Sequence, residues 1–112
     1  MPQQKELVSV VVPIYNERES LQELTQKLRD AFQNAPYSLE IIFVDDGSKD
    51  GSKAIEKELS DSYENIIQID FLTNKGKAEA LNAGFDAAQG DFVATIDADL
   101  QDDPYAIPEM VD

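Results

Sequence analysis

Four short apolar runs, separated by segments with helical periodicity, constrain the fold of this chain more than any other feature. The runs extend from Val8 to Pro13, Leu39 to Val44, Ile66 to Leu72 and Phe92 to Ile96. Their nearly continuous apolar character and their β-branched residues are typical of strands buried on both faces of a parallel sheet. Regular alternation of strands and helices with short connections predicts an α/β fold with helices on the faces of that sheet.

The segments between the runs repeat apolar residues at helical spacing. The expected apolar faces are Leu21, Leu24, Leu28 and Phe32 in the first helix, Ala54, Ile55 and Leu59 in the second, and Leu81, Phe85 and Ala88 in the third. Gly90 follows the third helix, where a glycine C-terminal cap is common. Pro104 and Pro108 predict a turn and the first turn of a further helix.

Composition restricts the chemistry that this chain can perform. Its 112 residues suffice for one domain, and its formal net charge of −14 argues against nucleic acid and anionic lipid as partners. The chain contains no histidine and no cysteine. Thiolate chemistry and Ser-His or Cys-His nucleophiles are therefore excluded, and any bound metal should be a hard cation held by oxygen atoms. No segment approaches about 18 consecutive apolar residues, so no membrane span is expected.

Acidic segments follow three of the four predicted strands. They read PIYNERE after the first, DDGSKDGS after the second and DADLQDD after the fourth. Ligands of open α/β sheets bind beyond the carboxyl ends of the strands. We therefore expect these acids to gather at the edge of the sheet where such a fold places its binding site.

Asp97 and Asp99 form an Asp-x-Asp triplet directly after the fourth strand. The chain has 13 aspartates, and chance alone supplies about one to two such triplets, so the pattern itself indicates little. A solvated acidic loop is one interpretation. Alternate residues at a strand end can also place two carboxylates on one side, where a divalent cation relieves their repulsion. Mg²⁺ or Mn²⁺ completed by substrate phosphates fits, whereas an EF-hand fails because Asp102 and Pro108 replace its glycine and glutamate.

Two further loops carry candidate ligands. Asp46, in the DDGS segment, is either a turn and capping residue or an acceptor of hydrogen bonds from a nucleoside. Lys77, at the start of the third helix, favours an anion such as a diphosphate, or simply begins the helix. Tyr15 either stacks on a base or covers the edge of the core. The sequence lacks the G-x-G-x-x-G and G-x-x-x-x-G-K-[ST] motifs of standard dinucleotide-binding and P-loop proteins.

Taken together, four segments resemble the family 2 glycosyltransferases, which have the GT-A fold. They are VSVVVPIYNE, IIFVDDGSKDGS, NKGKAEALNAG and FVATIDADLQDDP, in this order and at similar spacing. The form DADLQDDP is most similar to the branch that includes the polyprenyl-phosphate (dolichol-phosphate type) sugar transferases. The resemblance implies a Rossmann-like GT-A parallel sheet truncated after the fourth strand. Residues 1–112 would be the nucleotide-sugar-binding half of the domain, a fragment of a longer protein and inactive alone.

The resemblance also implies individual roles. Nucleotide contacts are expected at Pro13, Tyr15, Glu17, Asp46, Lys77 and Asp97, and metal contacts at Asp99, Asp97 and Gln101. The donor would be a nucleotide diphosphate sugar, the cofactor Mg²⁺ or Mn²⁺, and the acceptor a polyprenyl phosphate or a saccharide. No catalytic base is expected here, because the family places it in the second half of the domain.

The sequence also leads to expectations about location, self-association and alternative functions. The parent protein should be cytoplasmic or lie on the cytoplasmic face of a membrane, and an unpaired sheet edge predicts self-association. A magnesium-binding, receiver-like signalling module is the main alternative, and a structural α/β domain with acidic loops is another. Receiver domains place an acidic pair after their first strand, whereas here the pair follows the second.

Overall fold

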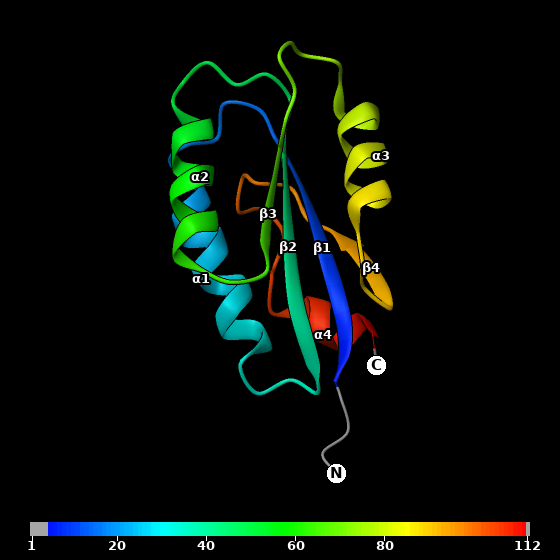
Figure 1. Cartoon of the computed structure of the whole chain (residues 1–112). Helices are drawn as coiled ribbons and strands as arrows, with labels where there is room; N and C mark the ends of the chain where they lie inside the picture. The colour runs from blue at the N-terminus through cyan, green and yellow to red at the C-terminus, as the bar shows by residue number, and fades with distance from the viewer. Residues whose placement is uncertain (1–4, 112) are drawn as a thin grey trace.

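The computed structural model describes residues 5–111 and contains within them a four-stranded parallel sheet. The elements, in chain order, are β1 (Glu6–Ile14), α1 (Leu21–Phe32), β2 (Tyr37–Asp45), α2 (Ser52–Ser62), β3 (Ile66–Asp70), α3 (Lys77–Ala87), β4 (Phe92–Thr95) and α4 (Ala106–Val111). The predicted α/β alternation is confirmed, and helices lie on both sides of the sheet (Figure 1).

The order of the strands distinguishes two of the expected functions. The strands lie in the order β3-β2-β1-β4, and every neighbouring pair is parallel. This is the Rossmann order, in which the direction of strand addition reverses beside the first strand. A receiver-like sheet places its third strand on the other side of the first, next to it. The observed topology is therefore wrong for a receiver domain and right for a Rossmann-like one.

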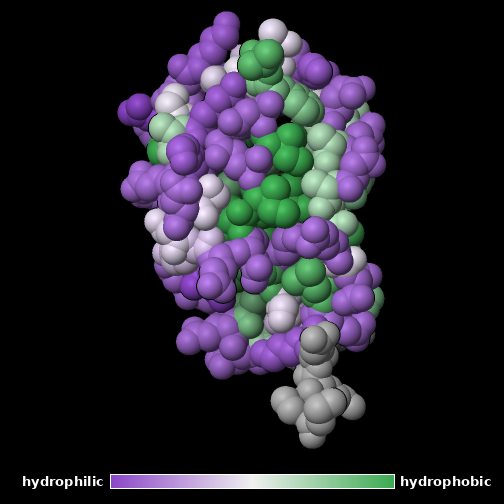
Figure 2. All heavy atoms as spheres, viewed as in Figure 1, coloured by the Kyte–Doolittle hydropathy of each residue, from purple (hydrophilic) through white to green (hydrophobic). Residues whose placement is uncertain are grey.

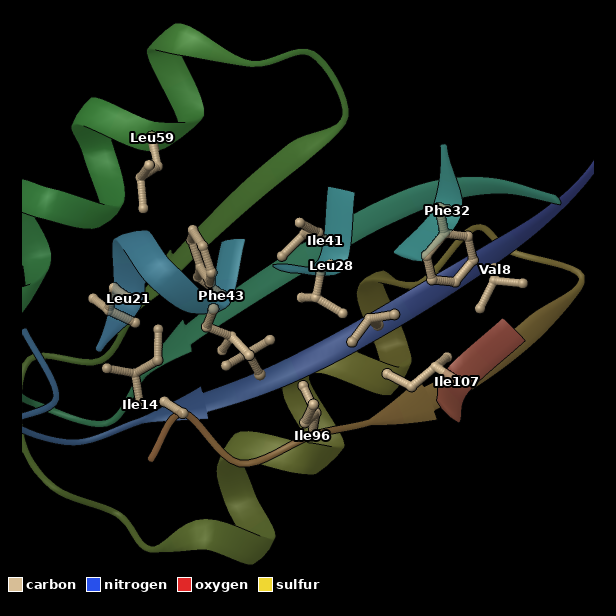
Figure 3. Packing of buried hydrophobic residues seen from close by; sticks show 14 residues of the cluster. Val8, Ile14, Leu21, Leu28, Phe32, Ile41, Phe43, Leu59, Ile96 and Ile107 are labelled. Carbon is tan, nitrogen blue, oxygen red and sulfur yellow. The ribbon is translucent and has the colours of Figure 1, made fainter. Parts of the chain in front are cut away.

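Two apolar clusters hold the helices against the sheet. The larger cluster joins β1 and β2 to α1, and Figure 3 shows Leu28 of α1 beside Ile41 of β2 and Phe32 of α1 beside Val8 of β1. The smaller cluster is Val11, Ile42, Val44 and Ala80, and it lies under α3. Adjacent β1 residues thus enter opposite clusters, which explains the continuous apolar run that predicted a strand buried on both faces.

The apolar face predicted for α1 is confirmed, whereas that predicted for α3 is confirmed at Leu81 and Ala88 and wrong at Phe85. On α3 the buried residues are Ala80 and Gly84, whereas Phe85 is 46% exposed. A Cβ atom on Gly84 would lie 2.3 Å from Cγ1 of Val11, so α3 approaches β1 more closely than any side chain allows. Small residues therefore form the contact face, and the larger Leu81 packs at its side.

Two predicted strands end earlier than expected. β3 stops at Asp70, level with the last residue of its partner β2, and Leu72 beyond it is 95% exposed. β4 stops at Thr95 instead of Ile96. Gly90 is not a helix cap, since Ala88 occupies that position after α3. A Cβ on Gly90 would lie 2.6 Å from Oγ of Ser9, so this glycine lets the chain pass close to β1.

The edges of the sheet expose apolar side chains. β3 and β4 are the outer strands, and Phe92 and Val93 of β4 are 38% and 46% exposed. Figure 2 shows a band of apolar atoms between the polar helical layers. Self-association through such an edge stays a prediction. None of the helices between residues 5 and 111 is long and apolar enough to cross a membrane.

The close packing of α3 predicts that Gly84→Ala destabilises the chain. An alanine is normally the better helix former by about 1 kcal/mol, but here its methyl group overlaps Val11. We expect the free energy of unfolding to fall by about 1–3 kcal/mol, the usual cost of overpacking. Urea denaturation measures the change. Asn82→Ala, on the exposed side of the same helix, is the control and should leave stability unchanged or slightly raised.

Candidate functional site

The register of the sheet sets where the acidic segments meet. Ile14, the last residue of β1, is level with Asp45, the last residue of β2. The loops that follow β1, β2 and β3 therefore emerge at one end of the sheet (Figure 1). β4 ends at Thr95, level with Val11, so the chain after it continues alongside the last residues of β1.

The continuation of β4 separates its apolar residues from its acids. Ile96 and Ala98 are buried in the larger core cluster. Asp97 and Asp99 alternate with them and are partly or fully accessible to solvent. Burial of the two apolar residues thus places both carboxylates on the side away from the core, as predicted, although a turn and not an extended strand carries them.

A cavity of about 290 Å³ opens at this edge of the sheet. Its lining includes every predicted site residue except Gln101, namely Pro13, Tyr15, Glu17, Asp46, Lys77, Asp97 and Asp99, and the rest of the lining is Ile14, Ala80 and Ala98. The structure therefore brings together residues from the ends of β1, β2 and β4 and from the start of α3. Gln101 is exposed and lies outside the lining.

Hydrogen bonds join the loop after β1 to the loop after β2. The N–H of Asn16 donates to Oγ of Ser48 at 2.8 Å, and the N–H of Lys49 donates to Oδ1 of Asn16 at 2.9 Å. The N–H of Glu17 donates to Oγ of Ser52 at 3.1 Å. Asn16 has a φ of 54°, which asparagine adopts more readily than most residues. The position of the first loop, which carries Tyr15 and Glu17, therefore depends on the second.

The two adjacent acids after β2 have different surroundings. Asp45 is fully buried, whereas Asp46 lines the cavity. The carboxylate of Asp46 accepts hydrogen bonds from the N–H of Lys75 at 2.6 Å and from the N–H of Gly76 at 3.0 Å. Asp46 consequently ties the loop after β3 to the loop after β2. A carboxylate has about four acceptor sites, which leaves capacity for a ligand.

The turn that carries Asp99 has a strained backbone. Oδ1 of Asp99 accepts the N–H of Gln101 at 3.1 Å. Leu100 between them has a φ of 66°, a left-handed conformation that costs a residue with a side chain roughly 1–2 kcal/mol. Strain of this kind is often found at functional sites. The chain bends at this residue, immediately after the second acid of the triplet.

Acids dominate the charge of the cavity. Lys77 is the single basic residue of the lining, against Glu17, Asp46, Asp97 and Asp99. Nζ of Lys77 pairs with Oδ1 of Asp97 at 2.7 Å, and this contact raises the pKa of Lys77. Burial, followed by the nearby charge of Asp99, raises the pKa of Glu17. An excess of negative charge remains, which a cation would relieve.

The chemistry of the lining suits a hard divalent cation. Asp97 and Asp99 offer oxygen ligands, and Mg²⁺ or Mn²⁺ is commonly held by one or two carboxylates with phosphates or water completing the shell. Across residues 5–111, no group of three or more acidic side chains is close enough to hold a metal ion. The residues therefore fit a cation whose shell a bound phosphate completes, and not a site built by the protein alone.

Sequence analysis missed residues that support the site. Oγ of Ser20 donates to the carbonyl of Ala98 and, at 3.1 Å, to the carbonyl of Glu17. Ser20 and Glu23 have the spacing of a capping box, yet no side-chain hydrogen bond caps α1. The serine before the helix was a visible signal. Its hydrogen bond to the carbonyl of Ala98, 78 positions away, depends on tertiary structure and could not be predicted from the sequence.

A larger hollow of about 750 Å³ lies at the opposite end of the sheet. Its lining includes Arg29 of α1, Tyr37 at the start of β2 and Ile66 at the start of β3. Ligands of open α/β sheets bind at the carboxyl ends of the strands, and none of the predicted site residues lies in this hollow. The smaller acidic cavity is therefore the candidate site.

A family comparison agrees with the fold. The model of the family described as Glycosyl transferase family 2 matches residues 9–112. The chain therefore belongs to glycosyl transferase family 2, a family of enzymes.

The chain is also similar to individual curated proteins. The chain is 42% identical over 106 residues to the undecaprenyl-phosphate 4-deoxy-4-formamido-L-arabinose transferase of Pseudomonas fluorescens (strain SBW25), a match that covers 94% of this chain and 31% of the relative. It is 40% identical over 105 residues to the bactoprenol glucosyl transferase of Shigella phage SfV, covering 94% and 34%. The chain thus spans about a third of the length of the relatives it matches.

A solved structure supports the fold in three dimensions. The mannosyltransferase PcManGT from Pyrobaculum calidifontis, in complex with GDP-Man and Mn²⁺, superposes with a TM-score of 0.78 at 25% sequence identity. The match covers 97% of this chain and 33% of that one. It confirms the GT-A fold that the sequence motifs implied.

The bonds of Asp46 predict that Asp46→Ala destabilises the chain. The substitution removes the charged acceptor of the amides of Lys75 and Gly76, and hydrogen bonds to charged groups contribute about 1.5–3 kcal/mol. We expect a loss of that size in urea denaturation and a smaller loss for Asp46→Asn, which keeps one oxygen. Asp86→Ala, at an exposed position of α3, is the control. Equal losses for Asp46→Ala and Asp86→Ala would contradict the prediction.

Proposed function

We propose that this chain forms the donor site of a glycosyltransferase and binds a nucleoside diphosphate sugar together with Mg²⁺ or Mn²⁺. Residues 1–112 would be the nucleotide-sugar-binding half of the GT-A domain. One observation carries the proposal. Residues predicted from four separate sequence segments line one acidic cavity at the carboxyl edge of a Rossmann-like sheet.

The wall formed by β1 and β2 is proposed to bind the nucleoside. The ring of Tyr15 is 47% exposed at the cavity, where it can stack on a base, and Pro13 and Glu17 lie beside it. Asp46 accepts hydrogen bonds from the base with the acceptor sites that Lys75 and Gly76 leave free. Its bonds to those two amides hold the carboxylate in place before a ligand arrives.

The wall formed by the turn after β4 and the start of α3 is proposed to bind the diphosphate and the metal. Asp99 and Asp97 would hold the cation, with Gln101 as a further ligand. When bound, the cation neutralises negative charge on the departing diphosphate. Lys77 now pairs with Asp97. Once Asp97 is neutralised, the ammonium group of Lys77 is free to contact the diphosphate.

The names of the relatives support a polyprenyl phosphate as the acceptor, with a saccharide as the alternative. In the proposed transfer, an acceptor phosphate oxygen forms a bond to the anomeric carbon of the sugar. The bond from that carbon to the diphosphate breaks, and its electron pair leaves with the nucleoside diphosphate. A phosphate oxygen is already anionic at neutral pH, so this acceptor needs no general base. A lipid acceptor places the reaction at a membrane surface, and we infer the cytoplasmic face.

Calorimetric titration tests the donor site. The chain is titrated with UDP, GDP and CDP, each with and without Mn²⁺, and we expect at least one of the three to bind when Mn²⁺ is present. Asp99→Asn removes a charge but keeps an acceptor for the N–H of Gln101. We expect it to weaken nucleotide binding by at least about tenfold, because contacts to charged groups contribute about 1.5–3 kcal/mol.

A matched variant controls for the loss of charge. Asp103→Asn changes another acid of the same acidic segment, outside the cavity lining, and should leave affinity within about twofold. A folded chain that binds none of the three nucleotides at any metal concentration would favour a purely structural domain. Equal affinities of the parent and Asp99→Asn in Mn²⁺ would show that Asp99 does not hold the metal.

A further inference from the structure

Asp45 and Glu56 place two carboxyl groups inside the protein. Asp45 ends β2, Glu56 lies in the middle of α2, and each residue is 0% exposed. Neither lines the cavity. An ionised carboxylate in such a position is very costly unless it is paired and hydrogen-bonded. The hydrogen bonds of these two carboxyl groups therefore determine whether both can be ionised.

The oxygen atoms of this pair lack donors. Oδ1 of Asp45 accepts the N–H of Ser48 at 2.7 Å. Oδ2 of Asp45 and both carboxyl oxygens of Glu56 are buried and receive no hydrogen bond from any donor group between residues 5 and 111. Glu56 nevertheless lies within hydrogen-bonding reach of Asp45. Two acceptors in contact are accommodated if one of them carries a proton and donates it to the other.

The surroundings decide which carboxyl group carries the proton. Burial, and then the contact with Asp45, raises the pKa of Glu56 to about 10. The charged groups that face it are Asp45 from β2 and Asp70 from β3, which raise the pKa, and Lys53 from α2, which lowers it. Nζ of Lys53 donates to the carbonyl of Phe71 at 2.9 Å. The N–H of Ser48 already donates to Asp45, which suits Asp45 to the role of acceptor in this pair.

We propose that Glu56 is a positioning residue of the donor site, whose protonated carboxyl group donates a hydrogen bond to Asp45 and so holds α2 against the turn that carries Asp46. The importance of that turn rests on the proposed function. Asp45 joins the turn through the N–H of Ser48 and joins β3 through its carbonyl, which accepts the N–H of Phe71 at 2.8 Å. The hydrogen bond from Glu56 to Asp45 connects α2 to this turn and to β3.

The pH dependence of stability tests the protonation of Glu56. A group with a raised pKa in the folded state contributes stability at low pH and loses it as pH rises. For Glu56 the loss begins above the ordinary glutamate pKa of 4.5 and continues to about 10. This one proton lowers the ratio of folded to unfolded chain about tenfold per pH unit. The chain has no histidine or cysteine, so few other side chains titrate between pH 6 and 9.

Glu56→Gln is the informative variant, because its amide donates to Asp45 at every pH. We expect urea denaturation of this variant to lose the tenfold-per-unit decline between pH 6 and 9. Glu58→Gln makes the same change at an exposed position of α2 and should retain the decline. An unchanged decline in Glu56→Gln would overturn the proposal.

Carbon-13 NMR of the glutamate carboxyl groups gives a direct signature. One signal, absent from Glu56→Gln, should keep the chemical shift of a protonated acid through pH 7. Titration of every glutamate near its ordinary pKa would refute the protonated pair. This measurement needs neither a destabilised variant nor a ligand.

Hydrogen exchange tests the positioning role. The amides of Ser48, Lys75 and Gly76 bind Asp45 or Asp46. We expect their protection to be retained in Glu56→Gln and reduced at least tenfold in Glu56→Ala, with Glu58→Ala as the control. Unchanged protection in Glu56→Ala would contradict the positioning role, and if that variant does not fold, Glu56→Asp takes its place. These readouts need no nucleotide, so their failure is separate from failure of the proposed donor site.

Discussion

The parallel pairing of β1 with β2 is the constraint on which the rest of the structure depends. The two strands pair along all nine residues of each, from Glu6 opposite Tyr37 to Ile14 opposite Asp45. Because both strands end at the same level, the loops that follow them lie side by side and exchange hydrogen bonds. A shift of one residue would move every side chain of one strand to the other face, and the two loops would no longer match.

The proposed donor site combines features that are unfavourable for the stability of the fold itself. Four acids line one cavity with a single lysine, and Leu100 adopts a strained backbone directly after Asp99. The larger core cluster lies directly beneath, where Ile96 and Ala98 are buried between and beside the acids. The apolar packing that offsets repulsion and strain thus comes from the same short segment. This arrangement is expected where a fold holds charged groups in place for a ligand instead of minimising its own energy.

Much of the fold and of the candidate site could be predicted because the signals are local. The apolar stripe of α1 reports burial directly, and the position of Asp97 and Asp99 after a strand places them at the binding edge of the sheet. The predicted face of α3 was wrong at Phe85, because Gly84, a residue without a side chain, makes the close contact with β1. Hydrophobic periodicity counts large side chains and cannot detect a contact that requires their absence. Gln101 is exposed and lies outside the cavity, directly after the left-handed backbone of Leu100.

The sequence by itself determined the alternation of strands and helices, the family, and the edge of the sheet at which the acids gather. These depend on residue type and spacing along the chain. Only the tertiary structure decided how neighbouring, chemically identical groups differ. Asp45 is enclosed next to Glu56 while Asp46 lines the cavity, and Glu56 is buried on a helix whose other acids are exposed. Burial and hydrogen bonding depend on which elements pack together. The type and spacing of residues along the chain do not reveal which distant residues become partners.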